Sequence, residues 1–141
     1  MRHIADALKD HDAAALKNVF SQRAREKAAN LGGGLAYFLS IFPAGLTTRT
    51  FNTVPGESGD NENGNRIVEL YADYKVSANG KEYDIYFTEI TVDEKDPAKI
   101  GIYSLGAVAH ADSGNFTASG KSTPFAAWKA TFAPGIYVPR K

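Results

Sequence analysis

A pair of strands joined at Asn79-Gly80 constrains the fold of this chain more than any other feature of its sequence. Asn-Gly is the preferred residue pair of a type I′ hairpin turn, because both central residues of that turn take a positive φ. A two-residue turn fixes which residues of the two strands lie opposite one another. The predicted pairs are Ala78 with Lys81, Val76 with Tyr83, Tyr74 with Ile85, Ala72 with Phe87, and Leu70 with Glu89.

Alternation of side chains along these strands sorts their residues onto two faces. The face expected to meet the core is apolar and consists of Val68, Leu70, Ala72, Tyr74, Val76, Tyr83, Ile85 and Phe87. The other face carries most of the charges and consists of Glu69, Tyr71, Asp73, Lys75, Glu82, Asp84, Tyr86 and Thr88. A slip of one residue would bury those charges, so the register is expected to be firm. Glu89 is the exception, because it is a carboxylate on the core side, just beyond Phe87.

Composition places the chain among globular proteins and excludes several functions. The 141 residues suit a single domain, 1–141, with a hydrophobic core. Lys plus Arg and Asp plus Glu both number 16, so no net charge favours nucleic acid or an anionic membrane. The absence of cysteine excludes disulfides and thiolate metal sites, and no spacing of His, Asp and Glu predicts zinc, so we expect no metal and no cofactor. No apolar run reaches membrane-spanning length.

Residues at about 2–42 are predicted to be helical. Apolar residues at helical spacing mark Arg2–Lys9, and a second helix is expected behind Asp12, a preferred N-cap residue. Ser21 is expected to cap a third, largely exposed helix at 22–31, which the glycines at 32–34 would end. A short, very apolar helix at 35–42 then stops at Pro43.

Residues at about 45–111 are predicted to form an antiparallel sheet. A β-branched strand at 45–54 is followed by a polar loop at 55–65 and then by the hairpin. A strand at 100–111 is apolar on both sides over much of its length, so it should be covered on both faces. A helix behind Thr123-Pro124 and the extended segment PGIYVP form a C-terminal part at about 122–139. Helices followed by an antiparallel meander predict an α+β fold.

Several segments together resemble a known family. These are IADALKDHDAAALKNVFS, YADYKVSANGKEYDIYF, DPAKIGIYSLGAV and PGIYVP, which span the chain from Ile4 to Pro139. They resemble a bacterial family of uncharacterised small lipoproteins, the domain-of-unknown-function family 5104. The resemblance implies a fold similar to nuclear transport factor two (a cystatin-like cone), in which helices pack on a curved antiparallel sheet and enclose a pocket. It transfers no catalytic residues, because the family has no established ones.

The same resemblance implies an exported protein that is anchored to the membrane through a lipidated N-terminal cysteine. No cysteine is present here, and the segment MRHIADALKD lacks the apolar core of a signal peptide. We therefore expect either an extracytoplasmic protein whose leader and anchor precede Met1, or a cytoplasmic protein.

A curved sheet closed by helices leaves a concavity, which is the default ligand site. The predicted register points Glu89 into this concavity, with Tyr74, Tyr83, Phe87 and Trp128 as its apolar lining. Apolar surroundings raise the pKa of a carboxyl group, which then suits a general base. The alternative is that Glu89, near a strand end, reaches solvent or a lysine.

Three further residues are candidates for chemistry or for contacts. We expect His110 either to pair with Glu89 or Asp112 as an acid–base dyad or to be an ordinary surface residue. Tyr71 and Tyr86 face away from the core, and exposed aromatic residues on a sheet face are typical of an interface. By analogy with similar folds, that face predicts a homodimer.

Two functions follow as hypotheses. The first is a non-catalytic binding domain for a small ligand or a protein partner, one form of which is an immunity protein that blocks a secreted toxin. The second is a cone-fold isomerase or dehydratase, in which Glu89, Tyr74 and His110 would move a proton beside a carbonyl group. The two hypotheses differ in whether Glu89 and His110 converge inside a closed cavity.

Overall fold

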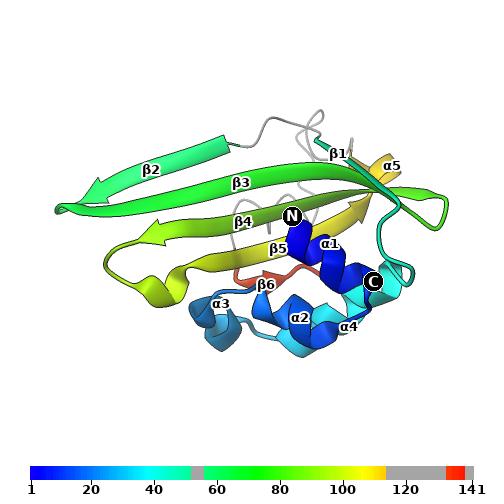
Figure 1. Cartoon of the computed structure of the whole chain (residues 1–141), viewed down its shortest axis with the longest axis horizontal. Coiled ribbons are helices and arrows are strands. Elements are labelled where there is room, and N and C mark those ends of the chain that lie inside the picture. The colour runs from blue at the N-terminus through cyan, green and yellow to red at the C-terminus, as the bar shows by residue number, and fades with distance from the viewer. Residues whose placement is uncertain (52–55, 114–132, 139–141) are drawn as a thin grey trace.

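The computed structural model describes residues 1–51, 56–113 and 133–138, in which N-terminal helices lie against one face of a long, curved sheet (Figure 1). The helices are α1 (Arg2–Lys9), α2 (Ala13–Asn18), α3 (Gln22–Lys27) and α4 (Leu31–Ile41). The strands are β1 (Thr48–Phe51), β2 (Gly56–Glu62), β3 (Asn65–Ala78), β4 (Lys81–Asp93), β5 (Gly101–Ala109) and β6 (Gly135–Ile136). A 3-10 turn, η1 (Pro97–Lys99), and a short helix, α5 (His110–Ser113), flank β5.

The described strands form one sheet in the order β1-β3-β4-β5-β6, and β2 pairs with β3 alongside β1. The long strand β3 pairs with β1 through its residues 74–77 and with β2 through its residues 65–71. Every pairing is antiparallel except that of β6 with β5. The α+β prediction is confirmed, whereas the finer cone-shaped fold similar to nuclear transport factor two stays a prediction.

The central hairpin has the register that the sequence predicts. All five predicted pairs are present, from Ala78 with Lys81 to Leu70 with Glu89. Asn79 and Gly80 have φ values of 51° and 71°, as a type I′ turn requires. Bulges follow further along, between Val68 and Glu69 in one strand pair and between Thr88 and Glu89 in the next.

The hydrophobic core fills the space between the helices and the predicted apolar face of β3 and β4. Leu8, Leu16 and Phe38 from the helices are fully buried there, together with Ile85 and Phe87 from β4. On β5 the residues at 104–107 are buried without a break, which confirms that this strand is covered on both faces.

The glycines at 32–34 do not end a helix, as the sequence suggested, but lie in the first turn of α4. Helix α3 already stops at Lys27, and Asn30 accepts a hydrogen bond from the backbone N–H of Gly33 at 2.9 Å as the N-cap of α4. A Cβ atom on Gly34 would lie 2.7 Å from the Cβ of Ile136. A glycine therefore lets α4 pass directly over β6. The predicted caps Asp12 and Ser21 are both confirmed.

The polar segment after β1 is a strand and not the predicted loop. Strand β2 pairs with β3 from Gly56 to Glu62, and Asn63-Gly64 turns the chain with φ values of 54° and 87°. Backbone pairing supplies the hydrogen bonds of a strand whatever its side chains are, so a polar sequence can form an exposed edge strand. The helix predicted behind Thr123-Pro124 lies outside the described residues.

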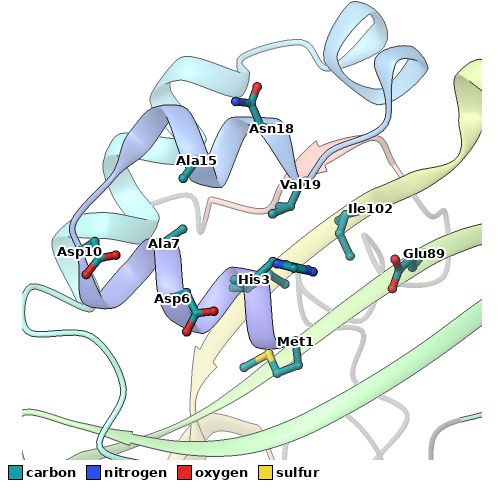
Figure 2. A pocket seen from close by; sticks show the side chains of 11 residues that line it. Met1, His3, Asp6, Ala7, Asp10, Ala15, Asn18, Val19, Glu89 and Ile102 are labelled. Atoms are coloured by element: carbon teal, nitrogen blue, oxygen red, sulfur yellow. The ribbon is translucent and has the colours of Figure 1, made fainter.

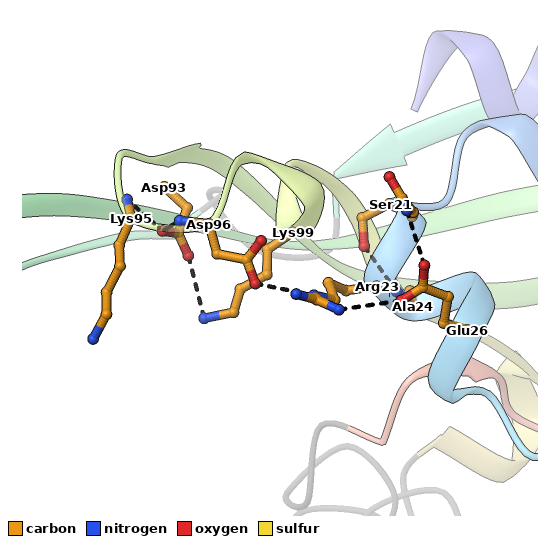
Figure 3. A network of polar contacts seen from close by, with 9 residues as sticks. Ser21, Arg23, Ala24, Glu26, Asp93, Lys95, Asp96 and Lys99 are labelled. Atoms are coloured by element: carbon orange, nitrogen blue, oxygen red, sulfur yellow. Dashed lines mark hydrogen bonds and ion pairs between the residues drawn. The ribbon is translucent and has the colours of Figure 1, made fainter.

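A network of hydrogen bonds and ion pairs links the turn between β4 and β5 to helix α3 (Figure 3). The buried carboxylate of Asp93 accepts hydrogen bonds from the backbone N–H groups of Lys95 and Asp96, at 3.1 and 2.7 Å, and pairs with Lys99 Nζ at 3.3 Å. Arg23 of α3 donates to Asp96 at 3.0 Å. This network holds one end of the helical layer against the sheet.

Candidate functional site

A cleft of about 550 Å³ lies between helices α1 and α2 and strands β4 and β5 (Figure 2). Its lining comes from the N-terminal helices and from one residue of each strand: Met1, His3, Ile4, Asp6, Ala7, Asp10, Ala15, Asn18, Val19, Glu89 and Ile102. Its volume is within the range of pockets that hold small ligands, about 300–1,000 Å³.

The amphipathic character of α1 positions one wall of the cleft. Ile4 and Ala7 are buried and also line the cleft, whereas His3, Asp6 and Asp10 are exposed along the same helix. In a helix, residues three and four apart share a face, so the polar side chains form a row beside the buried ones. The wall is therefore apolar at its base and polar at its rim.

The opposite wall is built where the α2–α3 connection joins the sheet. The backbone N–H of Ile102 donates to the carbonyl of Val19 at 3.0 Å, and that of Ser21 donates to the carbonyl of Ile102 at 2.9 Å. Phe20 thereby forms a parallel bridge with Ile102, as a strand would. Gly101 permits this approach, because it has a φ of +123° and a Cβ atom there would lie 3.0 Å from the backbone nitrogen of Ser21.

Glu89 lies opposite Leu70 on β3 and Ile102 on β5, so its side chain is on the helix side of the sheet. This direction is the one that the hairpin register predicted. Figure 2 shows the His3 ring extending from α1 toward the part of the cleft that carries Ile102 and Glu89. Within the described residues the side chain of Glu89 has no hydrogen bond or ion pair, so the predicted alternative of a contact with lysine is not seen there.

Apart from His3, the ionisable side chains of the lining are acidic. Asp6, Asp10 and Glu89 contribute three carboxylates, and none of the described lining residues is Lys or Arg. Arg2 reaches Asp6 from outside the cleft at 4.0 Å, with 85% and 63% of the two side chains exposed. An exposed pair at this distance contributes little, so Asp6 keeps most of its effect on the cleft.

Three members of the predicted aromatic lining lie in or against the hydrophobic core and not in the cleft. The Tyr74 and Phe87 rings stack with centroids 6.1 Å apart, and Tyr83 meets Phe42, the residue that follows α4, edge-on at 5.1 Å. Phe42, at the C-terminal end of α4, therefore packs beside Tyr83, and the open cleft lies further along β4, at Glu89. Trp128 lies outside the described residues.

His110 pairs with Asp84 of β4 in the structure. The Nδ1 atom of His110 lies 2.9 and 3.0 Å from the two carboxylate oxygens of Asp84. Asp84 alternates with Ile85 on β4 and so is on the face away from the helices and from Glu89. The side chain of Asp112 lies outside the described part of the chain. The described part of the structure thus gives no support to a dyad of Glu89 and His110.

The face that was expected to expose Tyr71 and Tyr86 is partly covered. Tyr86 is only 5% exposed because it packs against Tyr137, with Tyr71 and Val108 beside it. Burial, together with Tyr71, Asp73 and Glu69 nearby, raises the pKa of Tyr86 to about 12. Tyr71 donates a hydrogen bond to Glu69 Oε2 at 2.6 Å, which raises its pKa to about 12 as well. The predicted interface, and the homodimer inferred from it, depended on an exposed Tyr86 and lose that support.

No group of three or more His, Asp or Glu side chains in the described residues is placed to hold a metal ion. None of the helices in this part of the chain is long and apolar enough to cross a membrane.

Fold and cleft together define an α+β domain with a cleft between its helical layer and its antiparallel sheet. More particularly, the chain belongs to the family described as Domain of unknown function (DUF5104), which matches residues 3–110. This match runs from His3 in α1 to His110, just after β5, so it includes the candidate His110 and every residue of the cleft except Met1. A comparison with curated proteins finds no match.

Proposed function

We propose that the domain is a binding module that takes a small ligand into the cleft between α1, α2, β4 and β5. The observation that supports this most directly is the cleft itself, with its volume of about 550 Å³ and an apolar base beside polar side chains. Ligand sites are commonly of this size and combine an apolar lining with a few polar groups that orient the ligand.

A screen of small molecules by two-dimensional NMR tests the proposal. Mixtures that contain a ligand should shift the amide signals of cleft residues such as Ala7, Val19 and Ile102, and leave those of the β2–β3 hairpin in place. The variant Ala15→Trp should abolish these shifts, because Ala15 lines the cleft and an indole ring would fill it.

Ala13→Trp is the matched control, since Ala13 is exposed on the same helix and does not line the cleft. It should leave the ligand-induced shifts unchanged. Shifts that persist in Ala15→Trp, or a screen in which no compound class moves the cleft signals, would contradict the proposal.

We further propose that the domain acts outside the cytoplasm as part of a membrane-anchored lipoprotein. Its support is the resemblance of the chain to a family of small bacterial lipoproteins. Fractionation of the native cells should place the protein with the membranes, and detergent should release it. Recovery in the soluble cytoplasmic fraction would contradict this location.

A further inference from the structure

We propose that the ligand of the cleft is an organic cation, a compound that carries an ammonium group on an apolar body. The inference rests on the proposed function, because it assigns a chemical class to a ligand of the same cleft. It depends on the charge of the lining, on where the carboxylates lie, and on the apolar base between them.

The negative charge belongs to the cleft and not to the protein as a whole. The chain has 16 Lys and Arg and 16 Asp and Glu residues, whereas the lining has three carboxylates and, among its described residues, His3 but no Lys or Arg. A cleft with low-dielectric walls focuses the field of such charges and raises the local concentration of oppositely charged ligands. An anion would meet the same field as repulsion.

The carboxylates of Asp10 and Glu89 are available to a ligand. Neither one has a hydrogen bond or an ion pair with its side chain in the described part of the protein. Asp6 has only the long contact with Arg2. A ligand ammonium would therefore not have to displace a strong internal partner.

The positions of the charges suit an extended ligand. Figure 2 shows Asp10 at one end of the cleft and Glu89 at the other, with Ala7, His3 and Asp6 between them. The apolar side chains of Ile4 and Ala7 line the base between the two ends. The apolar body of a ligand can lie on that base while its ammonium group meets a carboxylate.

Three probes with the same apolar body separate charge from shape: phenethylamine, phenethyl alcohol and hydrocinnamate. They present an ammonium, a hydroxyl and a carboxylate group on one phenylethyl body. In NMR titrations at neutral pH, the amine should shift the cleft signals and saturate. The alcohol should bind several-fold more weakly, and the carboxylate should give no saturating shifts in the cleft.

Glu89→Gln should weaken the amine about two- to fivefold, the effect of one partly exposed charge pair, and leave the alcohol unaffected. Added salt should weaken the amine in the same way. The control is Glu82→Gln, the same change on β4 but seven residues away, roughly 23 Å along the strand. Glu82→Gln should leave all three titrations unchanged.

The outcomes distinguish this inference from the proposed function. Equal or tighter binding of the alcohol or the carboxylate in the cleft would overturn the cation assignment and leave the cleft as a ligand site. Failure of all three probes, while another compound class from the screen still shifts the cleft signals, would overturn the assignment in the same way. Absence of cleft shifts with every compound class would overturn both.

Discussion

The backbone N–H of Ile102 donates a hydrogen bond to the carbonyl of Val19 at 3.0 Å, and the side chains of both residues line the cleft. One strand residue and the end of α2 are therefore held together by main-chain geometry at the place where a ligand would bind. The shape of this wall therefore depends on how closely two backbones approach.

Gly101→Ala should destabilise the protein and disturb the cleft. Gly101 has a φ of +123°, and a Cβ atom there would lie 3.0 Å from the nitrogen and 3.2 Å from the Cα atom of Ser21. We expect a loss of more than about 1 kcal/mol in the free energy of unfolding, because alanine is strained at this φ and the contact is with backbone. Denaturant titration measures the loss.

Gly32→Ala is the control for that change. Gly32 lies in the first turn of α4, and a Cβ atom there would meet nothing within 4 Å. Alanine should be neutral or stabilise the protein by up to about 1 kcal/mol, since glycine is the weaker helix former. Equal losses for the two variants would mean that Gly101 has no special role.

Phe87→Ala should cost about 3–5 kcal/mol, because Phe87 is 1% exposed in the core and truncation leaves a cavity. On an open sheet face Tyr86→Ala would cost less than half of that, but Tyr86 is packed against Tyr137. We therefore expect a loss of at least about 2 kcal/mol for Tyr86→Ala as well. Denaturant titrations of both variants test this, and a loss below about 1 kcal/mol for Tyr86→Ala would mean that this face is open.

Asp93 should make the protein sensitive to acid. The backbone N–H of Asp96, and then Lys99 and the N–H of Lys95, lower the pKa of Asp93 against the opposing effect of burial. A carboxyl group with a lowered pKa in the folded state stabilises the protein above its unfolded pKa, near 3.8, and this contribution is lost as the pH falls through the folded value. The stability advantage of the wild type over Asp93→Asn should therefore shrink below about pH 4.

Unfolding curves at a series of acidic pH values measure this effect. The control is Asp60→Asn, a change at an exposed position on β2. Its stability relative to the wild type should stay constant over the same pH range. An advantage over Asp93→Asn that does not depend on pH would contradict an ionised, stabilising Asp93.

Tyr71 should titrate unusually late in alkali. Its hydrogen bond to Glu69 raises the pKa to about 12, so the phenol stays protonated in the folded protein when it would ionise in the unfolded chain. A raised pKa contributes stability that is complete below the unfolded value, near 10, and is lost as the pH rises toward about 12. Tyrosinate absorbance should show Tyr71 ionising earlier in Glu69→Gln, and an unchanged titration would exclude Glu69 as the cause.

The parts of the fold that could be predicted are those that local residue chemistry determines. Asn79-Gly80 fixed the turn, and alternation then assigned Phe87 to the core and directed Glu89 toward the helices. A second Asn-Gly pair, at Asn63-Gly64, is the same signal for the β2–β3 hairpin. This pair alone does not predict the hairpin, because the residues before it are polar and show no apolar alternation.

The rest of the candidate site could not be predicted, because it depends on how elements pack together. No local pattern shows that Phe42, at the end of α4, packs against Tyr83 while the space beside Glu89 stays open. No local pattern shows that Tyr137, which is distant in the sequence, covers Tyr86. Asp6 and Asp10 read as ordinary surface residues of an amphipathic helix until α1 is placed over the sheet.

The cleft has one wall on the helices and the other on the sheet, so a bound molecule would touch both layers at once. Its binding energy would add to the free energy that keeps α1 docked, and partial detachment of that helix would release it. Slower amide hydrogen exchange along α1 would then report occupancy, even for a compound too weakly bound to survive purification.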